Sequence, residues 1–317
     1  MNIPSIRKKF FAKKTFFSFL LAFIIFYLFL SNINARNVVK TISNANLYFL
    51  VFAFLLYYIS FLFKSLRWRL IIENVGLKTR LASVYEIYFL GQFVNSVLPG
   101  RIGDFYRAQL MKKNYGIARS KIIATIFSEK IIDIIFIISS LLVSALFLFG
   151  NDIPKGVIQI LFFGGSLVIV LSCSIMFMKK LQIILFSRIP KNIREIFENF
   201  EKSYVRSINF RTFPTILIFT LLIWFFEFLI FFFVTKSIGL NLGISLIIFT
   251  IVMANILLIV PITPSGLGVI EAGVIGVLIF VGVNKDIAVA VTLLNNIVNY
   301  WNQLLFGFFA YAFSKKV

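Results

Sequence analysis

Histidine is absent from the 317-residue sequence, and cysteine occurs once, as Cys173. Without histidine the chain cannot form a His-dependent catalytic dyad, a His-ligated metal site or a histidine pH switch. A single cysteine excludes an intramolecular disulfide. The sequence also has no phosphate-cradling Gly-rich loop, no dinucleotide-binding Gly motif and no catalytic metal cluster. We therefore expect no cofactor and no bound metal.

Charged residues are also scarce. They make up 14% of the chain, whereas 60% is apolar and the mean hydropathy is +0.97. No soluble domain has this composition, which predicts an all-α polytopic membrane protein. The net charge of +20 comes from Lys and Arg that stand between apolar runs, where they set orientation and contact anionic headgroups. Membrane lipids are thus the expected partners and nucleic acid is not, while self-association into a homo-oligomer stays open.

Apolar runs of spanning length divide the chain. The first follows five Lys and Arg, and no small-x-small cleavage site comes after it, so we interpret it as a retained span and not as a secretory signal. In a later run, Glu227 stands alone among aromatic residues and is expected to pair with a basic residue from the other half of the chain. The predicted full spans, about six, are residues 15–30, 47–63, 122–149, 157–178, 214–235 and 287–313.

Two further apolar stretches are broken by proline and glycine. Residues 84–98 would cover only about two-thirds of a ~30 Å hydrocarbon core before they stop at Pro99. A second apolar stretch stops before Pro264. Aligned on these prolines, both breaks read Pro-x-x-aliphatic-Gly, and Gly103 matches Gly268. Because Pro removes a backbone donor and Gly adopts angles closed to other residues, each break predicts a re-entrant helical hairpin.

The spans and hairpins together predict an inverted repeat within one integral membrane domain. Its halves are residues 1–150 and 151–317, and the second half carries an amphipathic insertion, 179–211, expected as a pair of cytoplasmic helices. Because loop Lys and Arg concentrate in 64–80 and 179–211, we place both loops and both termini on the cytoplasmic side of the cell (plasma) membrane. The first hairpin then opens from inside and the second from outside. Hydropathy leaves open an alternative of eight spans without re-entrance.

Charged residues follow the first break. Arg101, Asp104 and Arg107 lie at the start of the half-helix, and Asn95 precedes it. Positions 104 and 107 share a helix face, which favours a structural ion pair. The N-terminus of a half-helix also presents free amides and a positive dipole end, and Arg adds paired donors, which favours phosphate binding. The two interpretations are compatible if Asp104 orients one Arg while the other faces lipid.

A second group of charges lies inside the predicted span 122–149. Glu129 and Asp133 stack on one helix face, beside Ser128 and Lys130. Charges inside a span cost at least about 2–3 kcal/mol each, so these side chains should face a polar interior. They predict a buried structural network, a polar path for a cationic or hydroxylated headgroup, or a proton site. The candidate binding residues at the second hairpin are Asn255, Pro264, Gly266, Gly268 and Glu271.

Three ordered motifs resemble a known family. They are Asn-Ser-Val-Leu-Pro-Gly-Arg-Ile-Gly-Asp-Phe-Tyr-Arg at 95–107, Ser-Glu-Lys at 128–130 with Asp133, and Pro-Ser-Gly-Leu-Gly-Val-Ile-Glu at 264–271. These motifs are similar to the flippase-like membrane domain of lysylphosphatidylglycerol synthases, which also occurs as a stand-alone family. The sequence departs from the family at Ser265, where Gly is common, and at Lys130, where Arg is frequent.

The resemblance implies a membrane part that moves aminoacylated phospholipid between leaflets, while a separate soluble domain makes that lipid. The chain stops at Val317 without such a domain, so we expect no aminoacyl transfer. We predict a flippase for an anionic or aminoacylated phospholipid or for a lipid-linked headgroup. The alternative is a membrane enzyme or assembly partner acting on polyprenyl-phosphate-linked sugars, with Glu129 or Asp133 as a base. Transport is favoured because such enzymes usually need a larger extramembrane loop for the sugar donor.

Overall fold

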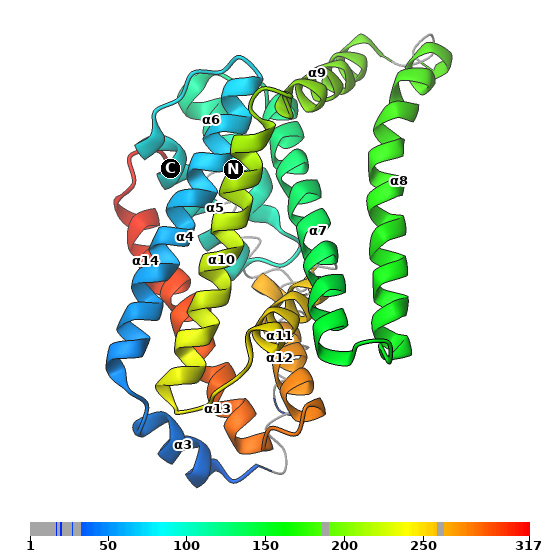
Figure 1. Ribbon diagram of the computed structural model, residues 1–317. Coiled ribbons are helices and arrows are strands. Elements are labelled where there is room, and N and C mark those ends of the chain that lie inside the picture. The colour runs from blue at the N-terminus through cyan, green and yellow to red at the C-terminus, as the bar shows by residue number, and fades with distance from the viewer. Residues whose placement is uncertain (1–16, 18–19, 21–26, 28–32, 186–189, 259–262) are drawn as a thin grey trace.

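The computed structural model describes most of the chain, and within the described part every regular element is a helix (Figure 1). The predicted first span, residues 15–30, falls outside the described residues except at three positions, and so do residues 259–262 before Pro264. The described residues are Phe17, Leu20, Tyr27, 33–185, 190–258 and 263–317, with the helical backbone alone described for 171–185 and 191–193.

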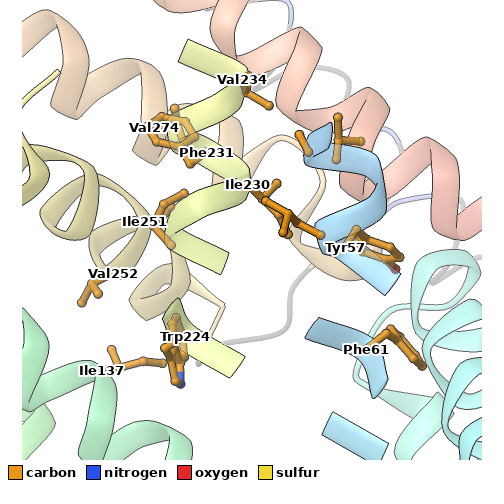
Figure 2. Packing of buried hydrophobic residues seen from close by; sticks show 14 of the residues in the cluster. Tyr57, Phe61, Ile137, Trp224, Ile230, Phe231, Val234, Ile251, Val252 and Val274 are labelled. Atoms are coloured by element: carbon orange, nitrogen blue, oxygen red, sulfur yellow. The ribbon is translucent and has the colours of Figure 1, made fainter. Parts of the chain in front are cut away.

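Three described helices are long and apolar enough to cross a membrane, namely α4 (Leu47–Asn74), α7 (Arg119–Phe149) and α10 (Phe213–Ser237). At about 1.5 Å per residue, each exceeds a ~30 Å hydrocarbon core. These helices confirm that the protein is a helical membrane protein. α4 and α10 pack along each other, and Figure 2 shows side chains of α10 at the centre of the apolar core. Figure 2 labels Tyr57, Phe61, Ile137, Trp224, Ile230, Phe231, Val234, Ile251, Val252 and Val274.

α4 is longer than the apolar run that predicts it. The sequence predicts a span over 47–63 followed by a basic interfacial segment, but the helix continues to Asn74. Arg67 and Trp68 in the continuation are only 1% and 0% exposed. Arg67 and Trp68 are thus covered by protein, and carboxylates from α7 neutralise the Arg67 charge inside the bundle.

The two broken stretches form helical hairpins. One consists of α5 (Leu81–Val97) and α6 (Ile102–Tyr115). The other consists of α11 (Ile244–Leu257) and α12 (Val269–Phe280), which follows a 3-10 turn at Pro264–Gly266. In Figure 1 the open ends of the hairpins lie at opposite ends of the bundle, and their tips point towards its middle. The fold thus has the opposed hairpins that the sequence predicts.

The two breaks share an unusual backbone shape. Gly100 and Arg101 have φ angles of 75° and 51°, and Ser265 and Gly266 have φ angles of 45° and 75°. Aligned on their prolines, Gly100 corresponds to Ser265, and Arg101 corresponds to Gly266. Residues other than Gly rarely adopt this left-handed region, so Arg101 and Ser265 are held there by the surrounding structure. The Pro-x-x-aliphatic-Gly pattern therefore marks two turns that have left-handed residues at the same two aligned positions.

The two glycines that end this pattern meet different needs. Gly103 lies inside α6, where an added Cβ would stand only 1.9 Å from the carbonyl oxygen of Gly91 on α5. A side chain at Gly103 would therefore force the first hairpin apart. Gly268 has a φ of 83°, which side chains disfavour. One glycine permits close helix packing, and the other permits the turn into α12.

The predicted last span is one helical rod with a local change of winding. α13 (Lys285–Asn296) continues through a π-helical turn, Ile297–Trp301, into α14 (Asn302–Phe313). A short helix that the sequence did not predict, α3 (Ala35–Ser43), packs on α13. Its flanking Asn34 donates a backbone N–H to the Asp286 carboxylate at 3.1 Å. This contact links the two halves of the chain at one end of the bundle.

The amphipathic insertion differs from its prediction. α8 (Lys155–Leu185) packs on α7 and stands apart from the rest of the bundle in Figure 1. α8 continues into the insertion because no Gly or Pro occurs between 179 and 185 to end it. Of the predicted pair of helices over 179–211, only α9 (Lys191–Ser207) is a separate helix, so the pair was wrong. α9 packs on α7 and buries Ser203 and Ser207.

We expect the two ends of the bundle to face opposite sides of the membrane. Phe210, between α9 and α10, is 94% exposed, and Asn151, between α7 and α8, is exposed at the other end. Single cysteines at these positions, in a Cys173→Ser background, should react with an impermeant maleimide from opposite sides. The concentration of Lys and Arg near position 210 predicts that this position is cytoplasmic. Labelling of both positions from one side would contradict the arrangement.

Candidate functional site

A buried carboxylate on α7 is the centre of the polar interior. Glu129 is 0% exposed, and three side chains donate to it. Its Oε1 accepts from the Tyr88 hydroxyl at 2.8 Å and from Arg67 Nη2 at 3.3 Å. Its Oε2 accepts from Arg107 Nη2 at 2.9 Å. Since α4, α5 and α6 supply these donors, one carboxylate joins the first hairpin to two long helices.

Arg107 is enclosed by aromatic rings. Its guanidinium carbon lies 3.9 Å from the centroid of the Trp68 ring and 4.0 Å from that of the Tyr88 ring. A cation over the face of an aromatic ring gains electrostatic attraction, and more so where both are buried. Gly91 makes room for this side chain, because a Cβ there would lie 2.4 Å from Arg107 Cγ. The sequence thus positions Arg107 by packing as well as by charge.

Arg67 binds a second carboxylate of α7. Its Nη1 and Nη2 donate to the two oxygens of Asp133 at 2.7 and 3.0 Å, a paired geometry that suits guanidinium. Nη1 also donates to Thr220 Oγ1 at 3.0 Å. Asp133 is 22% exposed along its side chain, whereas Arg67 is 1% exposed. Arg67 therefore binds Asp133, and it shares Glu129 with Arg107.

A partly exposed rim continues this cluster towards the first break. Asp104 lies 3.7 Å from Arg107 Nη1 and 3.9 Å from Lys130 Nζ. The side chains of Asp104 and Lys130 are 12% and 27% exposed. Asn95 joins the rim by accepting the Gly103 backbone N–H at 2.7 Å, which satisfies a free amide in the first turn of α6. The rim thus places ionised groups at the tip of the first hairpin.

The tips of the two hairpins touch. Arg101 Nη2 donates to the carbonyl oxygen of Leu258 at 3.3 Å, at the C-terminal end of α11, where a cation is favoured. Ser265 Oγ donates to Ser96 Oγ at 3.4 Å. Tyr300 from the π-helical turn donates to the backbone carbonyl of Ser96 at 3.0 Å. Both halves of the chain therefore contribute to one junction inside the bundle.

Glu271 occupies a separate polar position in the second hairpin. It is 2% exposed, and its Oε1 accepts from Asn296 Nδ2 at 2.6 Å. Its Oε2 has no hydrogen-bond partner among the described residues. Glu271 thus contacts α13, and it does not join the Glu129 cluster.

Apart from Glu271, the sequence-predicted candidates divide into three groups. Ser128 bonds Ala124 and Ser207, and Asn255 donates to the carbonyl of Ile251, so neither joins the cluster. Pro99, Pro264, Gly266 and Gly268 form the two breaks and offer backbone geometry instead of side-chain chemistry. The candidates that the structure brings together are Asn95, Arg101, Asp104, Arg107, Glu129, Lys130 and Asp133.

Sequence reasoning missed Arg67, Trp68 and Tyr88. A signal for Arg67 exists, since it continues a polar stripe on α4 with Ser60 and Lys64, at spacings of four and three residues that share a helix face. No comparable signal marks Trp68 and Tyr88, because aromatic residues are common throughout the chain. Their role depends on the tertiary position of Arg107.

The polar stripe of α4 also accounts for Glu227. Lys64 Nζ lies 2.7 Å from Glu227 Oε1, and Ser60 Oγ donates to the same oxygen at 2.8 Å. The prediction that Glu227 pairs with a base from the other half is therefore confirmed. α4 thus supplies cations to acids from both halves of the chain.

These features define a helical membrane protein in which two broken hairpins meet beside a buried cluster of ion pairs. The chain belongs to the family of the lysylphosphatidylglycerol synthase TM region, whose sequence model matches residues 15–307. The resemblance seen in the three motifs is thereby confirmed.

Several relatives are also named as membrane proteins. The UPF0104 membrane protein MJ1078 of Methanocaldococcus jannaschii is 34% identical over 218 residues, which cover 68% of this chain and 91% of that protein. The UPF0104 membrane protein PH1989 of Pyrococcus horikoshii is 23% identical over 85% of this chain and 88% of its own length. A UPF0104 membrane protein of Methanothermobacter thermautotrophicus is 23% identical over 93% of this chain and 92% of its own length.

Two arginines on α4 provide a test of the cluster. Arg67→Gln should lower the free energy of unfolding by about 3–5 kcal/mol, because it leaves buried carboxylate charge uncompensated. Arg69→Gln is the matched control, since Arg69 is 36% exposed and pairs with Glu73 one helical turn away. Its loss should cost about 0–1 kcal/mol. Unfolding titrations in mixed micelles would measure the free energy of unfolding of both variants, and equal losses would contradict the assigned role of Arg67.

Proposed function

We propose that this protein moves the polar headgroup of a lipid between leaflets while the acyl chains stay in the bilayer. The observation that carries the proposal is the contact between the two hairpin tips beside a rim of partly exposed charges. Broken helices in corresponding places of two halves are typical of transporter binding sites. Membership of a family named for the membrane region of a lipid-modifying enzyme supports the choice of a lipid.

The cluster and the rim have different roles in this proposal. Arg67, Arg107 and Glu129 are at most 1% exposed and already paired, so they orient α4, α6 and α7. Asp104 and Lys130 are partly exposed at the rim, and the backbone carbonyl of Arg101, at the tip, accepts the Asp104 N–H at 3.1 Å. A headgroup that reaches the rim meets groups of both signs, which lowers the cost of taking its charges into the membrane.

The proposed substrate class follows from the rim. Arg101 stands at the N-terminus of α6, where the helix dipole and free amides favour a phosphate. Lys130 adds a second cation, while Asp104 suits a cationic or hydroxylated group attached to that phosphate. An anionic or aminoacylated phospholipid and a polyprenyl-phosphate-linked sugar both have this chemistry. Both are therefore included in the proposal.

A catalytic base in the cluster receives less support. Both oxygens of Glu129 accept bonds from buried donors, and both oxygens of Asp133 accept from Arg67. A general base must come within hydrogen-bond reach of the proton that it removes, whereas Glu129 is fully buried and paired bonds from Arg67 hold Asp133. We therefore favour transport over the alternative of an enzyme acting on lipid-linked sugars. We also propose the cell membrane as the location, with the end formed by α9 and the start of α10 in the cytoplasm.

Liposomes containing the purified protein provide the direct test of transport. Labelled anionic, aminoacylated and polyprenyl-phosphate lipids should be tried in turn, with protein-free liposomes as the reference. We expect faster leaflet exchange for at least one of them, with no covalent change of the lipid by mass spectrometry. No acceleration for any of these lipids would contradict the proposal, and a new lipid product would favour the enzyme.

Variants of Lys130 at the rim and of Arg101 at the hairpin tip should separate transport from folding. Arg101→Gln and Lys130→Gln should each lower the exchange rate about ten- to a hundredfold, since a charge-assisted phosphate contact is worth roughly 1.5–3 kcal/mol. Arg101→Lys should recover part of the rate, because an ammonium lacks the planar fork of Arg. Lys112→Gln, an exposed position near the end of α6, is the control. An unchanged lipid exchange rate in both Arg101→Gln and Lys130→Gln, with normal melting, would refute this assignment.

A further inference from the structure

A basic pocket lies at the end of the bundle where α4 ends and α5 begins, away from the hairpin tips. Its volume is about 500 Å³. The connection between α4 and α5, the end of α6 and the last residues of the chain form its walls. The lining residues are Lys78, Thr79, Arg80, Ser83, Asn114, Tyr115 and Lys316.

The cations of this pocket are available to a ligand. Lys78 and Arg80 are exposed, and neither forms a salt bridge with a carboxylate in the described part of the chain. Arg80 is also the N-cap residue of α5, and its side chain does not cap that helix. The first amides of α5 therefore lack a side-chain acceptor and add the positive end of a helix dipole to the pocket.

Lys316, the third basic residue that lines the pocket, is held in position by its neighbours. Lys316 Nζ donates to Ser83 Oγ at 2.6 Å and lies 3.0 Å from Glu86 Oε2. Asn114 Nδ2 donates to the backbone carbonyl of Lys316 at 3.3 Å, and Lys113 Nζ donates to that of Val317 at 2.6 Å. These bonds fasten the last residues against α5 and α6. The wall that Lys316 provides is thus part of the folded structure.

A buried hydroxyl without a partner points to a missing ligand. Thr79 is 8% exposed and lines the pocket, and its Oγ1 has no hydrogen-bond partner among the described residues. Buried polar groups are nearly always hydrogen-bonded, so this hydroxyl, enclosed just beneath the pocket surface, is available to bond a ligand once its side chain turns towards the pocket. This observation is independent of the basic charge around it.

We propose that this pocket binds a phosphate group carried by a lipid headgroup or by a soluble molecule. Phosphate oxygens accept paired bonds from the Arg80 guanidinium and a charge-assisted bond from Lys78. The Thr79 hydroxyl supplies a further donor, and the amides at the start of α5 face the same anion. The site is separate from the proposed translocation path, since none of its residues belongs to the rim or to the Glu129 cluster.

Affinities of the full-length protein in detergent test this proposal. Microscale thermophoresis should compare dioctanoyl phosphatidylglycerol and inorganic phosphate as probes. The Lys78→Gln/Arg80→Gln double variant should bind roughly ten- to a hundredfold more weakly, and Thr79→Val should also lose affinity without melting earlier. The matched control is Arg36→Gln/Lys40→Gln on α3, which removes the same charge from exposed positions at the opposite end.

The two probes distinguish the sources of the phosphate. If the double variant loses affinity for phosphatidylglycerol alone, the result supports a lipid headgroup as the ligand. If it also loses affinity for inorganic phosphate, the result supports a soluble phosphate compound. Failure of the wild-type protein to bind either probe would overturn the proposal. Equal affinities in the double variant and in the control variant would overturn it too.

Discussion

The pairing of Glu129 with two arginines is the interaction on which the first half of the fold depends. A buried carboxylate alone would be strongly unfavourable, and so would a buried guanidinium. Because Arg67 comes from α4, Arg107 from α6 and Tyr88 from α5, the charges can be satisfied only when these helices pack together on α7. The ion pairs thus select one arrangement among helices whose apolar faces would otherwise pack in several ways.

That arrangement has consequences for the hairpins. Helix breaks inside a membrane are tolerated only where the freed backbone groups are buried in protein or line a polar cavity. Here the side chain of Asn95 binds an amide freed at the first break, and Arg101 binds a carbonyl at the end of α11. Each break is therefore stabilised by polar groups near it, and the first reaches across to the second half. A junction built in this way suits a headgroup better than it suits an acyl chain.

The sequence predicted the features that membrane physics makes costly. Paired Pro-Gly breaks and charges such as Glu129 inside a span are expensive in lipid, and long apolar runs are expensive in water, so each carries information that does not depend on an alignment. Features that depend on tertiary contacts were missed or wrong. The buried ion pairs of Arg67 were missed because its partners lie far away in the sequence, and nothing local marked Trp68 as a wall of the Arg107 site. The insertion 179–211 was misdivided because an amphipathic pattern does not define where a helix ends.

A reversible cross-link between the hairpin tips tests the central claim most directly. Ser96 Oγ and Ser265 Oγ lie 3.4 Å apart, so cysteines at both positions, in a Cys173→Ser background, should form a disulfide on oxidation. If the junction of the hairpins is the headgroup path, oxidation should abolish lipid exchange in liposomes, and reduction should restore it. Each single-cysteine variant should be insensitive to oxidation. A quantitative cross-link that leaves lipid exchange at its reduced-state rate would contradict the account.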